Sequence, residues 1–177
     1  NADEILIDDL NFAFDNNNAI KTTSGIDYNH LKLSDLFFKG NSIAVTDNEY
    51  NGVVDSFTFK EKSGFQLDEL STAFHYTDKG VSLKNLVLKT PQTTLQNAVL
   101  VTYPSIESIS KNPENLTLDA NLKDSKISFK DVLLLVPQLQ SNPVFKNYAN
   151  AVVDFNAVVK GKVNNLKIDQ FNAAGLG

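Results

Sequence analysis

The chain has 177 residues, enough for one substantial domain, and its net charge is −5. All sixteen basic residues are lysines, so the arginine-bearing basic face of a nucleic-acid-binding protein is missing and no nucleic-acid partner is expected. The lack of cysteine excludes disulfides and thiolate metal sites, and no apolar run is long enough for a membrane-spanning helix. With 42% hydrophobic residues and twelve phenylalanines, the composition favours a folded protein built from strands.

A six-residue pattern, apolar–any–apolar–polar–acidic or amide–apolar, recurs along the chain. Its first and third positions alternate as in a half-buried strand, but its sixth position is out of phase. One extra residue at this point predicts a β-bulge, and the same bend in successive strands would fold a sheet along a line. The acidic and amide positions are interpreted as bend-makers, because Asp and Asn accept unusual backbone angles. The copies are residues 5–10, 31–36, 65–70, 81–86, 127–132 and 166–171.

Strand-like alternation continues between these copies, in segments 42–46, 53–60, 98–103, 116–122 and 151–163. Many short strands separated by turn-forming residues predict an antiparallel meander, and the lack of alternating strand–helix units disfavours a parallel α/β fold. The expected turns are 15–18, 39–41, 48–52, 62–64 and 78–80.

Two short helices are predicted between residues 131 and 149, where they would plug an end or an edge of the folded sheet. Residues 131–136 have apolar side chains at helical spacing, and Pro137 interrupts the run. Asn142 and Pro143 are typical of a helix start, with an N-cap followed by proline at the first helical position. The apolar face of this second helix would consist of Val144, Phe145 and Tyr148.

The loop 104–115 is expected to be an exposed connection, or a soft boundary within a single segment spanning residues 1–177.

The residues that carry catalysis in other proteins form no recognisable site here. His75 lies between two aromatic residues of a strand and is expected on the solvated side, while His30 lies in a turn-like stretch. Neither histidine has partners at metal-ligand spacing. The pairs Asp8-Asp9 and Asp68-Glu69 are adjacent in strands, so the two acids of each pair face opposite sides. Hydrolase, nucleotide-binding and metalloprotease motifs are absent, so no enzyme activity, metal or cofactor is expected.

The apolar stripe has two interpretations that alternation cannot separate, because both hide the same face. It is either the packed core of a closed β-sandwich, acting as an adhesin or interaction module, or the lining of a trough that holds acyl chains. The candidate groove residues are Phe12, Phe14, Phe57, Phe59, Phe65, Leu67, Phe74, Leu83, Leu88, Ile127, Phe129 and Phe155.

Three stretches carry a resemblance to a known family. They are 57–67, 160–168, and 127–139 with the following Asn142, Pro143 and Phe145. These stretches resemble the AsmA/TamB-like envelope proteins, particularly the long forms of Bacteroidota. The resemblance covers most of the chain, and the helix-bearing segment 127–145 is its most specific part.

The resemblance implies a fold, a location and partners. It implies a mainly β protein, an antiparallel meander curved into a U-shaped groove with an apolar concave side, in the periplasm of the cell envelope. The implied function is non-enzymatic: acyl-chain binding for phospholipid transport between the inner and outer membranes, or outer-membrane assembly. The chain is expected to be a segment of a longer, membrane-anchored protein, whose other regions would contact an outer-membrane assembly protein.

Overall fold

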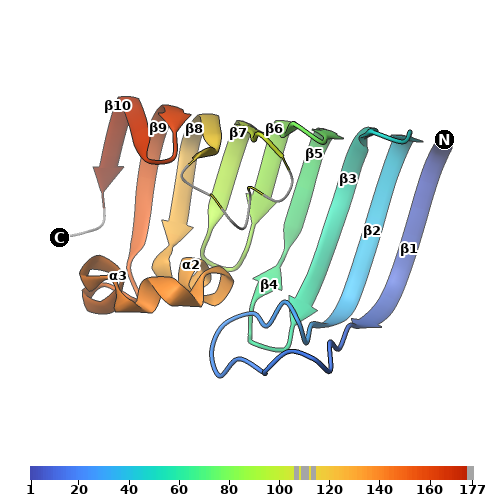
Figure 1. Cartoon of the computed structure of the whole chain (residues 1–177), viewed down its shortest axis with the longest axis horizontal. Helices are drawn as coiled ribbons and strands as arrows, with labels where there is room; N and C mark the ends of the chain where they lie inside the picture. The colour runs from blue at the N-terminus through green and yellow to red at the C-terminus, as the bar shows by residue number, and fades with distance from the viewer. Residues whose placement is uncertain (106–107, 109–111, 113–114, 175–177) are drawn as a thin grey trace.

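A computed structural model describes residues 1–105, 108, 112 and 115–174. In this described part, one open antiparallel sheet of ten strands makes up most of the molecule (Figure 1). The strands are β1 (Ala2–Ala13), β2 (Lys32–Val45), β3 (Glu49–Glu61), β4 (Gln66–Leu67), β5 (Glu69–Thr77), β6 (Gly80–Lys89), β7 (Thr94–Thr102), β8 (Thr117–Ser128), β9 (Val152–Lys162) and β10 (Asn165–Ala174). The mainly β fold class is therefore confirmed.

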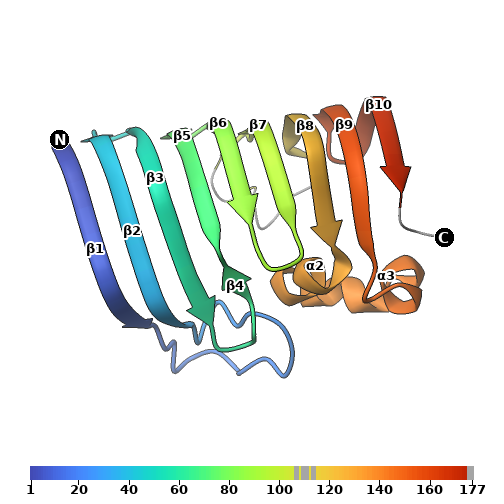
Figure 2. The same cartoon turned by 180° about the vertical axis from the view of Figure 1, so that it is seen from behind.

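The strand order confirms the predicted meander. It runs β1-β2-β3-β5-β6-β7-β8-β9-β10, with the short β4 pairing only with β3. Figure 2 shows β1 and β10 at opposite edges, so the sheet does not close into a barrel. Strand β7 pairs directly with β8, so the sheet continues across the loop 104–115, much of which lies outside the described residues.

The predicted bulges occur in three copies of the repeated pattern. Asp9 in β1, Asp35 in β2 and Asn85 in β6 have positive φ angles of 54°, 52° and 52°, and each lies at a shift in strand register. Asp and Asn enter this left-handed region more readily than most residues, which explains the residue types at the fifth position. Asp124 in β8, outside the pattern, forms a further bulge with φ of 47°.

The remaining copies behave differently. In residues 65–70 the chain leaves the ladder at Asp68, between β4 and β5. In residues 166–171 the register shift lies between Ile168 and Gln170, so the extra residue is Asp169, one position earlier than expected. The expected bulge in residues 127–132 is wrong, because β8 ends at Ser128 and a helix follows.

A network of polar hydrogen bonds explains this helix start. The Asp131 carboxylate accepts hydrogen bonds from the hydroxyls of Thr90 and Thr93, both at 2.6 Å, and so ties the helix to the β6–β7 turn. The Thr93 hydroxyl in turn accepts the Ser128 amide at 3.0 Å, where the strand ends. An acid in the first turn also complements the helix dipole. These contacts favour a helix over a bulged strand.

The two predicted helices are confirmed as α2 (Phe129–Leu135) and α3 (Pro143–Asn147), joined by the 3-10 helix η2 (Pro137–Ser141). The Asn142 side chain caps α3 by accepting the Val144 amide at 2.9 Å. The expected apolar face of α3 is only partly correct. Phe145 packs on Phe129 with ring centroids 4.8 Å apart, but Val144 and Tyr148 are half-exposed.

The expected turn at residues 39–41 is wrong, because β2 runs through it without interruption. Gly40 is needed for packing there: a Cβ atom would lie 2.8 Å from the Phe38 ring and 2.9 Å from the Val53 carbonyl oxygen. The separate strand expected at residues 42–46 is for the same reason the end of β2, which stops at Val45.

Candidate functional site

One face of the sheet is apolar along its whole width. Directly opposed residues of antiparallel strands share a face, so the strand register identifies its members. The pairs on this face are Leu10–Leu36, Ile7–Phe38, Phe38–Phe57, Phe74–Leu83, Leu83–Val99, Val99–Ala120, Ala120–Val159 and Val159–Ile168. Ile7 and Leu10 of β1 are three positions apart, yet both side chains lie on this face because the bulge at Asp9 adds one residue between them. The pattern found in the sequence therefore defines one continuous surface.

Phenylalanine rings form a connected row on this face. Phe38 meets Phe57 edge-on at 6.0 Å, Phe57 lies 5.3 Å from Phe59, and Phe59 lies 6.0 Å from Phe65. Aromatic pairs of this kind contribute about 0.5–1.5 kcal/mol beyond the area they bury. The row extends from β2 across β3 to the turn before β4, and it forms the floor of the face.

An apolar hollow of about 470 Å³ lies on this face. Ile5 of β1 and Leu83 of β6 line the same hollow although three strands of the sheet separate them, so the sheet curves towards its apolar side. The single polar residue in the lining, Thr72, donates its hydroxyl to the Lys84 carbonyl oxygen at 3.0 Å and so adds no free polar group. The full lining is Ile5, Phe38, Ile43, Val54, Phe57, Leu70, Thr72, Phe74, Val81 and Leu83.

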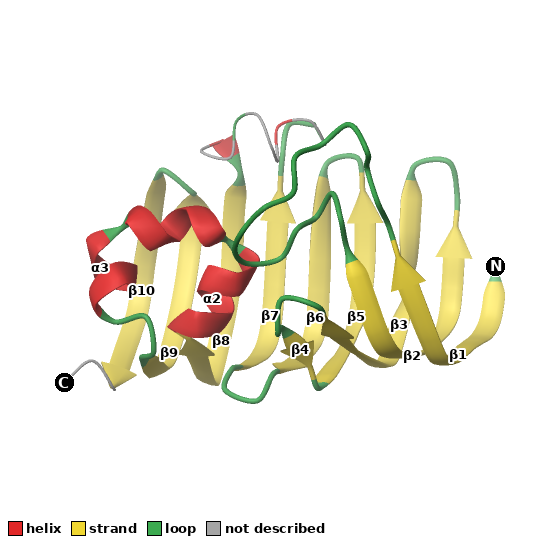
Figure 3. Cartoon of the chain, turned by 90° about the horizontal axis from the view of Figure 1, so that it is seen from below, coloured by secondary structure: helices red, strands yellow, loops and turns green. Residues whose placement is uncertain are grey.

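A cap closes the lower end of the apolar face, which is the end at the bottom of Figure 1, where β1 ends and β2 begins. Figure 3 shows the loop that joins β1 to β2 lying beside the helices, over the strand ends. The Ile26 amide donates to the Leu134 carbonyl oxygen at 2.7 Å, and the Tyr28 hydroxyl donates to that of Leu135 at 2.9 Å. Under this cap Ile26, Phe65 and Leu67 are buried together, with Leu88 and Leu134 packed against them. The prediction that the helices plug one end of the sheet is thus confirmed.

A buried histidine holds the cap loop together. His30 Nδ1 lies 3.0 Å from Asp27 Oδ2, and His30 Nε2 lies 3.3 Å from Asp15 Oδ1. Burial alone would raise the pKa of the Asp27 carboxyl, but hydrogen bonds from Thr22, His30 and Asn29 lower this pKa below its usual value. No group of acidic and histidine side chains in the described ranges is placed to hold a metal ion. The cluster fits a structural role.

The opposite face is polar and solvated. His75 is exposed there, 3.5 Å from Glu49, which confirms its expected side. Lysines pair with acids across or along the strands, and these contacts are of the exposed kind that adds little stability. The pairs are Lys39–Glu4 at 3.8 Å, Lys60–Asp35 at 2.8 Å, Lys89–Glu69 at 2.7 Å and Lys160–Asp119 at 3.2 Å.

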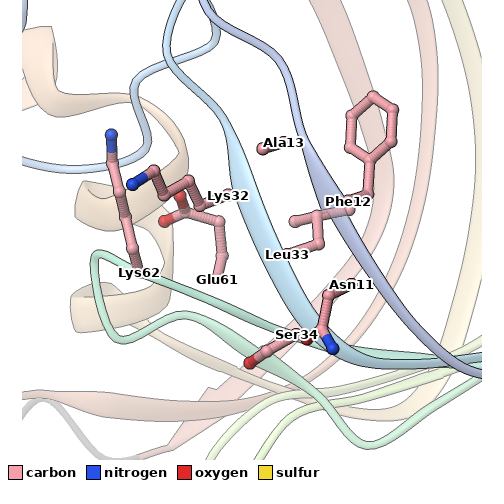
Figure 4. Close-up of a pocket in the computed structure, with 8 residues that line it drawn as sticks. All are labelled: Asn11, Phe12, Ala13, Lys32, Leu33, Ser34, Glu61 and Lys62. Carbon is pink, nitrogen blue, oxygen red and sulfur yellow. The ribbon is translucent and has the colours of Figure 1, made fainter.

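A second hollow, of about 430 Å³, lies at the lower end of β1 and β2. Figure 4 shows its mixed character: Lys32, Glu61 and Lys62 stand on one side, and the ring of Phe12 points away on the other. The lining consists of Asn11, Phe12, Ala13, Lys32, Leu33, Ser34, Glu61 and Lys62.

The candidate groove residues fall into five groups. Phe57, Phe74 and Leu83 line the apolar hollow, whereas Phe59, Phe65, Leu67 and Leu88 pack under the cap. Phe12 and Phe14 are exposed at the β1 edge, and Ile127 and Phe155 lie opposite Val153 and Ser125 in the β8–β9 ladder. Phe129 was expected on a strand; it instead begins α2.

Sequence reasoning missed several lining residues. Phe38 and Val81 follow or begin copies of the repeated pattern, so the alternation phase was a usable signal for both. Ile43 and Val54 carried a weaker signal, because bulges at Ser42 and Asp55 shift the phase of β2 and β3 beside them.

No family model, curated protein or solved structure matches this chain. Among the described residues, no helix has the length and apolar character needed to cross a membrane. The geometry of the apolar face is therefore the basis on which a function can be assigned.

Proposed function

We propose that this chain is a lipid-binding segment of an AsmA/TamB-like protein of the periplasm. Its apolar sheet face holds phospholipid acyl chains during transport between the inner and outer membranes, or during outer-membrane assembly, where other regions of a longer anchored protein contact an assembly partner. The observation that carries this proposal is the hollow of about 470 Å³, whose lining is apolar except for Thr72, a residue with its hydroxyl already bonded to the Lys84 carbonyl oxygen.

The physical driving force is burial of acyl methylene groups. Each one that leaves water contributes about 0.8 kcal/mol, so burial of about ten methylenes, most of one acyl chain, contributes about 8 kcal/mol against the cost of association. The hollow has the volume typical of small-molecule sites. Its aromatic floor is held by ring contacts rather than by ligand, so the site is formed before a lipid arrives.

The open sheet favours this function over the alternative of a closed sandwich module. In a sandwich, a second sheet would cover the apolar face. The described strands form one sheet, and in the described part of the chain the cap packs on one end of the face. An apolar surface left open in this way is typical of a ligand or partner site.

Two consecutive phenylalanines provide the test. Phe38 lies opposite Phe57 on the apolar face, whereas Phe37 lies opposite Thr58 on the polar face of the same strand. A photo-reactive phenylalanine analogue at position 38 should crosslink to phospholipid in vesicles, and the same analogue at position 37 should give only background labelling. Lipid extraction and native mass spectrometry of the purified chain supply an independent readout.

Equal labelling at positions 37 and 38 would contradict the assignment of the lipid-binding face. If neither position labels and no lipid co-purifies or binds, the proposal is wrong.

A further inference from the structure

The mixed hollow at the lower end of β1 and β2 contains an unusual carboxylate. Glu61 is only 4% exposed, and its Oε2 atom accepts the Ser63 amide at 2.7 Å. Its Oε1 atom is buried without a hydrogen-bond partner, and it is the only such carboxylate oxygen among the described residues. An unpaired buried carboxylate oxygen is costly and calls for a donor.

The nearby lysines do not supply this donor. Lys32 and Lys62 line the same hollow, but neither forms an ion pair with Glu61. Lys62 instead donates to the backbone oxygen of His30, and Lys32 is exposed at the hollow. The hollow thus offers two cations for an anionic group and one carboxylate for a cationic N–H donor.

An apolar lane connects this hollow to the acyl-binding hollow. Along β1 and β2 it consists of the opposed pairs Phe12–Leu33, Leu10–Leu36 and Ile7–Phe38, and it ends at Ile5. Phe12 and Ile5 are seven residues apart, about 20 Å along a strand. One acyl chain spans about 15 Å, half of a bilayer's hydrocarbon core. A lipid whose headgroup lies at the mixed hollow can therefore extend its tail along most of this lane, towards the acyl-binding hollow.

We infer that the mixed hollow is a headgroup site for a phosphate ester that carries a primary ammonium group, as in phosphatidylethanolamine. The inference rests on the proposed acyl-chain function. Lys32 and Lys62 contact the phosphate, and the ammonium donates to Glu61 Oε1. Both lysines are exposed, so their side chains can swing to the phosphate. The ammonium donates as a cation to the carboxylate, whereas phosphatidylcholine has no N–H to donate and the hydroxyls of phosphatidylglycerol donate without a positive charge.

The test is competition between three phospholipids with identical acyl chains. The purified chain is incubated with vesicles of phosphatidylethanolamine, phosphatidylcholine and phosphatidylglycerol in equal amounts, re-isolated, and its bound lipids are measured by mass spectrometry. We expect about tenfold enrichment of phosphatidylethanolamine over phosphatidylcholine, which corresponds to about 1.4 kcal/mol. Enrichment of phosphatidylglycerol would show that the lysines act alone and would overturn the inference.

Two variants locate the preference. Glu61→Gln keeps an acceptor for the Ser63 amide and should reduce the enrichment to near unity. Glu69→Gln removes the same charge from an exposed pair with Lys89 and should leave the enrichment unchanged. Enrichment that persists in Glu61→Gln contradicts the assignment of the site, and the wild-type enrichment alone remains decisive if this variant does not fold.

Soluble glycerophosphoethanolamine distinguishes a lipid headgroup from a free phosphate ester. It lacks acyl chains and should not displace bound lipid at equal concentration; displacement would show that the site binds the soluble ester. Equal binding of the three lipids overturns the headgroup site and leaves the acyl-chain function standing. Failure to bind any lipid overturns both.

Discussion

Asp35 of β2 and Asn85 of β6 adopt the same left-handed backbone conformation, each with φ of 52°, at the points where their strands change phase. This conformation costs about 1–2 kcal/mol for most residues with a Cβ atom. Asp and Asn reduce the cost through local hydrogen bonding of their short polar side chains. The bulges of the sheet are therefore encoded in single side chains.

Replacing Asn85 tests this encoding. Asn85→Val should lower the free energy of unfolding by about 1–2 kcal/mol, because a β-branched residue is strained at positive φ. Asn85→Gly should be nearly neutral, because glycine accepts this conformation without strain. Urea denaturation measures both values. Lys84→Val, one residue earlier on the polar face, is the control and should change stability by less than about 0.5 kcal/mol. Equal effects of Val and Gly at position 85 would refute the backbone explanation.

The cap depends on one leucine of a consecutive pair. Leu134 packs on the cluster around Ile26, whereas the Leu135 side chain is exposed. Leu134→Ala should cost about 2 kcal/mol, at the low end for buried leucines, because Leu134 is only half-buried.

Hydrogen exchange of the Ile26 amide reports on the cap directly, since this amide bonds to the Leu134 carbonyl oxygen. Its exchange should accelerate in Leu134→Ala and remain unchanged in Leu135→Ala. Acceleration in both variants would mean that the cap depends on helix stability and not on this packing.

The polar network at the start of α2 depends on one hydroxyl, that of Thr93. Thr93 donates to Asp131 and accepts from the Ser128 amide, so Thr93→Val removes two hydrogen bonds at constant shape. The variant should lose about 1–3 kcal/mol of unfolding free energy, because Asp131 and Ser128 both lose a partner in a buried site. Thermal unfolding measures this loss, and Thr94→Val, at the next residue, should have little effect on the unfolding free energy. An unchanged free energy of unfolding in Thr93→Val would mean that the polar network contributes nothing to stability.

The Asp27 carboxylate predicts a pH dependence of the cap loop. Its pKa is lowered below the usual 3.8, so the stability it contributes is present above this value and is lost as the pH falls through the folded-state pKa. The difference in melting temperature between wild type and Asp27→Asn should shrink as the pH falls below about 4. Asp47→Asn, in an exposed turn, should show no such trend. A difference that grows on acidification would reverse the sign and contradict the prediction.

The strand pattern and the bend positions were predictable because their signals are local. Alternation on either side of Asp9, Asp35 and Asn85 showed both the face and the phase shift. The bulge signal failed at Asp131, where the helical spacing of residues 131–136 competes with it and the hydroxyls of the distant Thr90 and Thr93 hold the start of the helix. A pattern of neighbouring residues contains no information about such partners.

Contacts between distant segments were not predictable for the same reason. Gly25 has φ of 68°, and a Cβ atom there would lie 2.5 Å from Pro137, so the cap loop requires glycine to approach η2. Nothing near Gly25 in the sequence indicates a partner more than a hundred residues away. The mixed hollow was missed likewise, because its lining comes from three strands and its unpaired carboxylate is evident only once Glu61 is buried.

The unbroken strand order has a consequence for how such proteins change size. Each strand of the path hydrogen-bonds only with its neighbours along it, so one additional hairpin would leave every other hairpin intact. It would widen the sheet by about 9.6 Å, two strand spacings. A single additional strand would instead send all later turns to the opposite rim. The apolar surface can therefore widen during evolution by one hairpin at a time, while the cross-section that receives a ligand stays constant.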